Sequence, residues 1–433
     1  MITGEDEVAR LCSELIRIDT YNHGDGRGAG ERLAAEQVAT WLTEVGLDPV
    51  YVESARRRGN VVVRLPGTDP TLPGLLIHGH LDTVPAIAGS WTVPPLSGEI
   101  IDDCVWGRGA VDMKNMDAMM LAVLRDLVRS GRRPRRDLVF AWLADEEAGG
   151  EFGARHLVEH RPDLFEGVTE AISEVGGFSV QVDAGVRLYF IETAQKGLLW
   201  LRLTAENRAG HASLIHPDNA VTELCAAVVR VGRHPWPFRL TPASRTLLRE
   251  LCDAYGLAYD EEDPGPALAA LGPLARLVGA SLTHISNPTR LHAGYATNVI
   301  PETATAEVDG RFLPGAEKDF LDTLGELLGP GVRHEVIDRD PGIEAPFDAP
   351  LVDSMLTALQ KEDPGARIAP YCLPAGTDNK AFHRLGVRGY GFVPLRLPPE
   401  LDFASMFHGV DERVPVEALR FGVRVLDRLL TTY

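Results

Sequence analysis

Short apolar runs that end in acidic or histidine residues recur along the chain, and they constrain its fold more than any other feature. Three such runs cover residues 75–77, 138–143 and 171–172, and the residues that follow them are His80 and Asp82, Glu146 and Glu147, and Glu174. Apolar runs of this kind are typical of buried strands. In an open α/β sheet, functional groups gather outside the carboxyl ends of the strands. The sequence therefore predicts a sheet with acidic and imidazole groups collected along one edge.

Length and charge limit the classes of protein to consider. With 433 residues the chain is too long for one ordinary core, so two domains are expected. Asp and Glu outnumber Lys and Arg by 62 to 43, for a net charge of −19. This balance disfavours nucleic acid and anionic membrane as partners, because both require basic surfaces.

Targeting signals and cysteine patterns are both lacking. Residues 1–10 are polar and acidic without an apolar signal segment, and no stretch is long and apolar enough to span a membrane. A cytoplasmic location is expected. The five cysteines are scattered and include no CxxC pair, so neither a disulfide framework nor a thiolate zinc site is expected.

The periodicity of apolar residues divides the chain into three parts. Helical spacing over 5–18, 30–45 and 114–130 alternates with strand patterns over 60–65, 74–78 and 138–144, which predicts a mainly parallel α/β sheet flanked by helices. Past residue 194 the pattern changes to strands over 198–204, 303–312 and 333–337 with a helix over 217–231. Helix and strand alternation returns after residue 345. We expect one domain from 1–194 and 343–433, interrupted by a smaller α+β domain over 195–342.

Two predicted strand ends carry the first candidate ligands. His80 is a candidate metal ligand because Asp82, two residues on, can hold its ring from behind. His78 lies on the same strand and is expected to be structural. Glu146 and Glu147 are adjacent, so on an extended backbone they point in opposite directions. One of them can bind a metal while the other faces a substrate water.

Asp112 is the candidate for a bridging ligand. It follows Gly109-Ala110-Val111, whose small residues permit close backbone approach. A carboxylate has two oxygens and can bridge two metals roughly 3.5–4 Å apart. The alternative is a helix N-cap before the helix at 114–130, and both roles can hold at once. Histidines together with carboxylates suit zinc better than calcium or magnesium, and they fit a hydrolytic site with two zinc ions.

Motifs spread over the chain carry a family resemblance. They are His80-x-Asp82, Gly109-Ala110-Val111-Asp112-Met113-Lys114, Asp145-Glu146-Glu147, Glu174 and Phe407-His408-Gly409, with supporting stretches at 91–98, 210–213, 298–301 and 376–378. In this order they resemble the aminoacylase, succinyl-diaminopimelate desuccinylase and glutamate carboxypeptidase family of di-zinc metallopeptidases. The resemblance extends from residues 16–20 to Arg413. It implies a zinc-peptidase-like catalytic domain with an inserted lid domain of the dimerisation type.

The resemblance also assigns roles at the metal site. His80, Asp112 and Glu174 would hold one zinc ion, and Asp112, Glu147 and His408 the other, with Co²⁺ or Mn²⁺ as substitutes. Asp82 would orient His80, and Glu146 would act as the general base. A cis peptide bond is implied between Asp112 and Met113.

Further roles fall in or near the small domain. By the same resemblance, His211 would donate to the oxyanion, Asn298 would approach the substrate and Arg311 would bind its free carboxylate, although Arg311 also fits an ordinary surface strand. Gly376 and Thr377 would contribute to the substrate cradle, but Ala375 stands where the family usually has glycine. The lid is longer than in compact relatives, which leaves open whether a homodimer forms through it.

The expected activity is zinc-dependent hydrolysis of an amide or peptide bond next to a free carboxylate. The substrate would be a small N-acyl amino acid or a short peptide. An aminopeptidase or dipeptidase on the same metal core is the alternative, and it requires an acidic pocket for a free amine. A non-catalytic binding protein is a third option, which the complete set of ligands and Glu146 disfavour.

Overall fold

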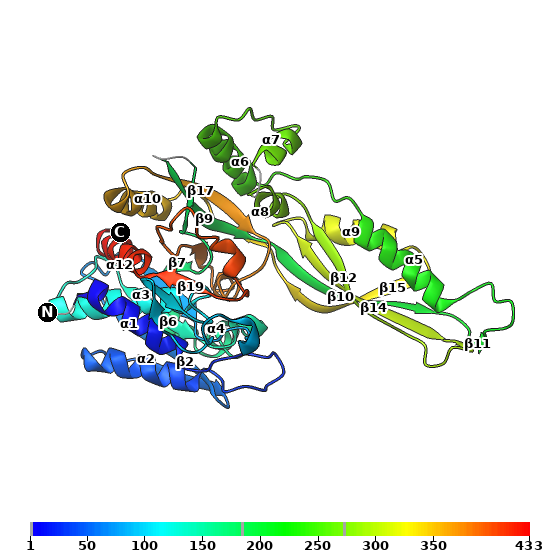
Figure 1. The fold of residues 1–433 in the computed structure, drawn as a ribbon, viewed down its shortest axis with the longest axis horizontal. Helices are drawn as coiled ribbons and strands as arrows, with labels where there is room; N and C mark the ends of the chain where they lie inside the picture. Colours follow the sequence, from blue (N-terminus) through cyan, green and yellow to red (C-terminus); the bar gives the residue numbers. More distant parts are fainter. Residues whose placement is uncertain (1–2, 183–185, 272–273) are drawn as a thin grey trace. The chain divides into compact units, whose positions relative to one another are not determined.

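The computed structural model describes residues 3–182, 186–271 and 274–433, and the chain forms two compact units (Figure 1). The larger unit comprises Met1–Thr193, Ala345–Pro370 and Thr377–Tyr433, and the smaller comprises Ala194–Glu344 and Tyr371–Gly376. The short segment Tyr371–Gly376 differs from the predicted division, which assigned it to the larger domain. Within the smaller unit, the amide of Lys196 donates to the carbonyl of Leu373 at 3.0 Å.

The main sheet of the larger unit has a parallel centre and antiparallel flanks. Its strands run in the order β1 (Val50–Ala55), β2 (Arg58–Leu65), β6 (Leu138–Leu143), β3 (Gly74–His80), β7 (Val168–Ser173), β18 (Arg388–Gly391) and β9 (Arg187–Gln195). The pairings β6–β3, β3–β7 and β7–β18 are parallel, and the outer pairings are antiparallel. Strands β8 (Ser179–Gln181), β16 (Ile343–Glu344) and β17 (Ala366–Leu373) pair with β9. The predicted α/β fold is confirmed, and the parallel pairings lie at the centre of the sheet.

Helices cover both faces of this sheet, which explains why its strands are apolar throughout. Side chains alternate between the two faces: Phe140 and Trp142 of β6 pack in one core, and Val139 and Ala141 in the other. The first core is shared with α1 (Gly4–Ile16), α2 (Arg32–Glu44), α3 (Lys114–Ser130), α10 (Pro350–Glu362) and α12 (Val416–Thr432). The second is shared with α4 (Ala154–His160) and α11 (Asn379–His383).

Capping residues set the ends of the principal helices. Thr3 caps α1, and its side chain and that of Asp6 satisfy each other's backbone amides. Helix α3 ends at Gly131, which adopts the left-handed conformation at φ 67°. The three-stranded sheet β4 (Ile100–Ile101), β5 (Cys104–Trp106) and β19 (Arg413–Pro415) and the 3₁₀ helices η1 (Ala88–Ser90), η2 (Glu146–Ala148), η3 (Pro162–Phe165) and η4 (Ala404–Met406) complete this unit.

The smaller unit is an antiparallel sheet with helices on one face. The strand order is β12 (Ile285–Ala293), β14 (Thr303–Phe312), β10 (Gly197–Glu206) and β15 (Val332–Asp340). Leu199, Leu201 and Leu203 of β10 point into a core shared with α5 (Ala220–Arg233) and α9 (Glu317–Leu328). The alternation predicted for residues 198–204 is confirmed. The remaining elements are α6 (Pro242–Tyr255), α7 (Gly265–Ala270), α8 (Leu274–Ala280) and the pair β11 (Gly210–His211) and β13 (Val299–Ile300).

Two further findings bear on the sequence predictions. All five cysteines are unpaired thiols. Within the described residues, no helix combines the length and the apolar character needed to cross a membrane.

Candidate metal centre

The parallel strands of the larger unit bring the predicted ligands to one edge of the sheet. His80 is the last residue of β3, Glu174 directly follows β7, and Glu146 and Glu147 lie in the turn after β6. Because β6, β3 and β7 are adjacent and parallel, their carboxyl ends coincide. Buried strands thus deliver groups that are far apart in sequence to a single place.

Asp112 lies between the two histidines. Its Oδ1 is 3.1 Å from Nε2 of His80, and its Oδ2 is 3.2 Å from Nε2 of His408. Oε2 of Glu174 is 3.5 Å from the same nitrogen of His80, and Oε2 of Glu147 is 3.1 Å from that of His408. The structure therefore brings together the two groups His80–Asp112–Glu174 and Asp112–Glu147–His408, with one Asp112 oxygen facing each. The peptide bond between Asp112 and Met113 is cis.

His80 is held from the side opposite the cluster. Its Nδ1 is 3.0 Å from the main-chain carbonyl of Asp82 and 3.5 Å from Oδ1 of the Asp82 carboxylate. Nε2 is therefore the nitrogen that faces Asp112 and Glu174. The sequence predicted that the Asp82 carboxylate holds the ring, whereas the shorter contact comes from the main-chain carbonyl of the same residue.

The backbone at Glu146 and Glu147 differs from the prediction. They begin the 3₁₀ helix η2 instead of continuing an extended backbone, because Asp145 turns the chain with a left-handed φ of 69°. The Glu147 carboxylate contacts His408. The Glu146 carboxylate instead has an oxygen within 4.8 Å of candidate ligand atoms of His80 and Glu174.

The pKa shifts within the cluster indicate that a positive charge near its carboxylates is favoured. Burial raises the pKa of Glu174 to about 6 despite its contact with His80. The carboxylates of Asp112 and Glu147 raise the pKa of His408 to about 10. Burial opposes the charged form of His80, yet Glu174, Asp112 and Asp82 outweigh it and hold the pKa of His80 well above its usual value. The directions of these shifts show that positive charge next to the carboxylates is favoured.

The kinds of side chain in the cluster indicate whether a metal ion would fit there. Two imidazole nitrogens and three carboxylates surround one place, and His80, Asp112 and Glu174 are buried there. Such groups are buried together only when they are paired or bind metal, and mixed nitrogen and oxygen donors are those of zinc and related divalent cations. The residues present therefore fit a metal pair.

His78 has a structural role, as predicted. Its Nε2 is 2.9 Å from Oδ1 of Asn379, its Nδ1 is 3.2 Å from Oγ of Ser173, and its ring packs on Phe382. Burial lowers the pKa of His78 to about 4, so the ring is neutral.

An ion pair between Arg108 and Glu412, which we call the clamp, joins two loops of the site. No role for these two residues was predicted from the sequence. Glu412 forms a buried ion pair with Arg108 and accepts the amides of Gly109 at 2.8 Å and Val111 at 3.2 Å. Arg108 also donates to the carbonyl of Gly409 at 2.9 Å. The clamp therefore joins the loop before Asp112 to the loop after His408. An acidic residue four positions after a candidate ligand was the available signal.

Asp378 was also left without a role. Its carboxylate is buried, and burial raises its pKa well above the usual value despite the nearby His80. Its electrostatic neighbours include Glu174 and Asp82. It directly precedes α11 and follows Thr377, whose hydroxyl accepts the amide of Asn379 at 3.2 Å.

The other predicted residues lie in the smaller unit. His211 on β11 pairs with Val299, and the amide of Ala212 donates to the carbonyl of Asn298 at 3.1 Å, so His211 and Asn298 share one tip. The His211 ring is exposed and contacts the Ser213 hydroxyl. Arg311 on β14 pairs with Asp309 at 2.6 Å, which places a carboxylate on the expected anion-binding group. Gly376 belongs to the smaller unit and Thr377 to the larger.

The strand ends of a mixed sheet and two adjoining loops bring two histidines and several carboxylates together, an arrangement that suits a metal-dependent hydrolase. Residues 76–432 match the model of peptidase family M20/M25/M40. Human aminoacylase-1 is 28% identical over 97% of this chain and 93% of its own. The N-fatty-acyl-amino acid synthase/hydrolase PM20D1 of Xenopus tropicalis is 29% identical over 85% of this chain and 74% of its own.

Solved structures show the same fold. The M20 family metallo-carboxypeptidase Sso-CP2 from Sulfolobus solfataricus superposes with a TM-score of 0.72, at 17% identity, over 98% of this chain and 99% of that one. The chain belongs to peptidase family M20/M25/M40. It is a metallohydrolase of amide or peptide bonds.

Proposed function

We propose that the chain hydrolyses the amide bond of an N-acyl amino acid, or the last peptide bond of a short peptide, next to a free carboxylate, with two zinc ions bound. The proposal is based on the position of Asp112, because each of its two carboxylate oxygens faces one histidine. One group would be His80, Asp112 and Glu174, and the other Asp112, Glu147 and His408. The names of the relatives, an aminoacylase and a metallo-carboxypeptidase, favour this substrate class.

Bound zinc would supply Lewis acidity to a water and to the substrate carbonyl. Glu146 would take a proton from the attacking water as the carbon–oxygen bond forms, and return it to the amine nitrogen as the carbon–nitrogen bond breaks. Glu147 contacts His408 and would bind metal, which leaves the role of base to Glu146. Asp82 would keep His80 oriented through its carbonyl.

Residues of the smaller unit would complete the site. His211 would donate to the developing oxyanion and Asn298 would approach the substrate, in keeping with their common place at one tip. To bind the substrate carboxylate, Arg311 would have to break its ion pair with Asp309. Gly376 and Thr377 would contribute to the cradle. A homodimer through the smaller unit is part of the same proposal.

Matched substrates test the proposal. N-acetyl-L-methionine and N-acetyl-L-methioninamide share the scissile amide and differ in the free carboxylate, and methionyl dipeptides add a free amine. We expect the zinc-loaded enzyme to cleave the acid and to leave the acetyl group of the carboxamide intact. Equal cleavage of both would remove the carboxylate requirement. Preference for dipeptides over every N-acyl compound would favour the aminopeptidase or dipeptidase alternative.

A further inference from the structure

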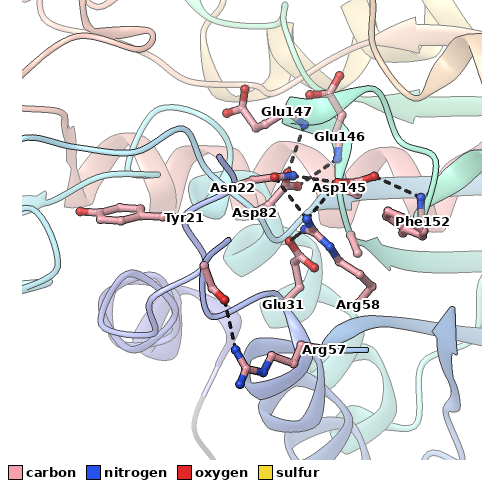
Figure 2. Close-up of polar contacts among 12 residues, drawn as sticks. Tyr21, Asn22, Glu31, Arg57, Arg58, Asp82, Asp145, Glu146, Glu147 and Phe152 are labelled. Carbon is pink, nitrogen blue, oxygen red and sulfur yellow. Dashed lines mark hydrogen bonds and ion pairs between the residues drawn. The ribbon is translucent and has the colours of Figure 1, made fainter. Parts of the chain in front are cut away.

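A buried polar network underlies the turn that carries Glu146 and Glu147 (Figure 2). We call it the Asn22 network, and its members are Asn22, Glu31, Arg58, Asp82 and Asp145. Each of these side chains is buried. Such a network is costly when partly satisfied and rigid when satisfied.

Asp82 fixes the backbone of the turn. Its Oδ1 accepts the amide of Glu146 at 3.1 Å, and its Oδ2 accepts the amide of Glu147 at 3.1 Å. One carboxylate therefore positions both residues at once. The Asp82 carboxylate can hold the turn in place only if other residues fix the carboxylate itself.

Asn22 holds it there. Its Nδ2 donates to Oδ2 of Asp82 at 2.9 Å and to Oδ1 of Asp145 at 2.9 Å. The two hydrogens of one amide group thus join two buried carboxylates that would otherwise repel each other. The main-chain amide of Asn22 donates to the carbonyl of Thr83 at 2.9 Å, which places Asn22 alongside the loop of Asp82.

Arg58 supplies the positive charge. Its Nη2 is 3.4 Å from Oδ1 of Asp145 and 3.3 Å from Oδ1 of Asn22, and its Nη1 is 2.6 Å from Oε1 of Glu31. Asp145 also accepts the amide of Phe152 at 3.1 Å with its other oxygen. Arg58 therefore holds both Asn22 and Asp145, the residue whose left-handed φ begins the turn.

We propose that Asn22 and Arg58 are positioning residues for the hydrolytic reaction, holding Asp82 and Asp145 so that the Glu146–Glu147 turn keeps its geometry. The inference rests on the proposed function, in which Glu146 is the base and Glu147 a ligand. Neither Asn22 nor Arg58 contacts the metal cluster in the pairings above, so both act through the turn.

Two pairs of variants separate positioning from packing. Asn22→Leu keeps the approximate shape but removes both donated bonds, and Asn22→Asp keeps the acceptor oxygen that faces Arg58 while adding a charge between two carboxylates. Arg58→Met removes the guanidinium, and Arg58→Lys restores a cation. Arg125→Met is the matched control, since Arg125 is a comparably buried arginine paired with Glu7 and Glu44 in another part of the larger unit.

The first readout needs neither metal nor substrate. Hydrogen exchange at residue resolution on the metal-free, full-length protein reports the amides of Glu146 and Glu147, whose acceptor is Asp82. We expect at least about tenfold faster exchange at both amides in Asn22→Leu, Asn22→Asp and Arg58→Met, because the carboxylate that protects them is released. Arg58→Lys should recover part of the protection, and Arg125→Met should match the wild type at these amides.

The second readout is kinetic. With zinc loaded, kcat of the same variants should fall roughly 10–100-fold, the range found for residues that orient metal ligands, while KM stays close to that of the wild type. Unchanged protection of the two amides in folded Asn22→Leu and Arg58→Met would overturn the inference, even if kcat falls. A wild-type protein without amidohydrolase activity would instead overturn the proposed function, and the exchange measurement would still decide the role of Asn22 and Arg58.

Discussion

Glu146 and Glu147 are neighbours with the same side chain and different surroundings. Glu147 contacts His408, whereas Glu146 lies by His80 and Glu174. We predict that Glu146→Gln lowers kcat by about 10²–10⁴, the usual contribution of a general base, with both metals retained. Glu147→Gln should lose metal. Elemental analysis of the two purified variants checks this, and loss of metal from Glu146→Gln alone would reverse the two assignments.

His211 is exposed on the short strand β11 of the smaller unit. If it donates to the oxyanion, His211→Ala should lower kcat by roughly 10²–10³. KM should change much less, because that interaction matures only in the transition state. His292→Ala, an exposed histidine on β12, is the control. A His211→Ala enzyme with the wild-type kcat would exclude His211 from the reaction.

At the scale of elements, the Arg108–Glu412 clamp joins two loops that each end or begin at a candidate ligand. We predict that Glu412→Ala lowers metal affinity by roughly 10–100-fold, since loss of groups that orient ligands has that effect. Competition with a chelator of known affinity measures the change. A folded Glu412→Ala protein that retains metal as tightly as the wild type would show that the loops hold their positions without the clamp.

His284 makes the stability of the smaller unit sensitive to acid. Its Nδ1 accepts the amide of Leu313 at 3.2 Å, and its ring packs on Trp236 and Phe320. Burial lowers the pKa of His284 from 6.5 to about 4. The unfolded chain therefore binds a proton that the folded chain does not, and stability should fall as pH falls from 6.5 to about 4.

The variant His284→Asn tests this origin of the pH dependence. Its side-chain oxygen can accept the Leu313 amide without titrating. Thermal unfolding between pH 4 and 7 should show a smaller decrease for the variant than for the wild type. If the melting temperatures of the variant and the wild type change equally with pH, His284 is not the source of the acid sensitivity.

The strands of the site could be predicted because burial on both faces makes them continuously apolar, as in β3 and β6. The turn after β6 could not. Its course depends on Asp145 in a left-handed conformation and on the Asp82 carboxylate, neither of which leaves a local pattern. The extended backbone predicted for Glu146 and Glu147 was therefore wrong.

At the scale of the whole molecule, alternation of helix and strand indicated a two-part catalytic domain with an insertion, and the structure shows two compact units. The candidate ligands could be named from the sequence because each follows an apolar run or belongs to a family motif. Asn22 and Arg58 follow no such pattern. They meet Asp82 and Asp145 only through folding of distant segments, so polar networks of this kind become visible only in three dimensions.

The central claim is that metal held by His80, Asp112, Glu147, Glu174 and His408 is required for amide hydrolysis. Exhaustive chelation followed by zinc titration, with N-acetyl-L-methionine as substrate, tests it most directly. We predict that activity is lost with the metal and returns in proportion to added zinc, reaching its maximum near two equivalents per chain, the stoichiometry of a two-metal site. Full activity in protein shown by elemental analysis to contain no metal would contradict the account.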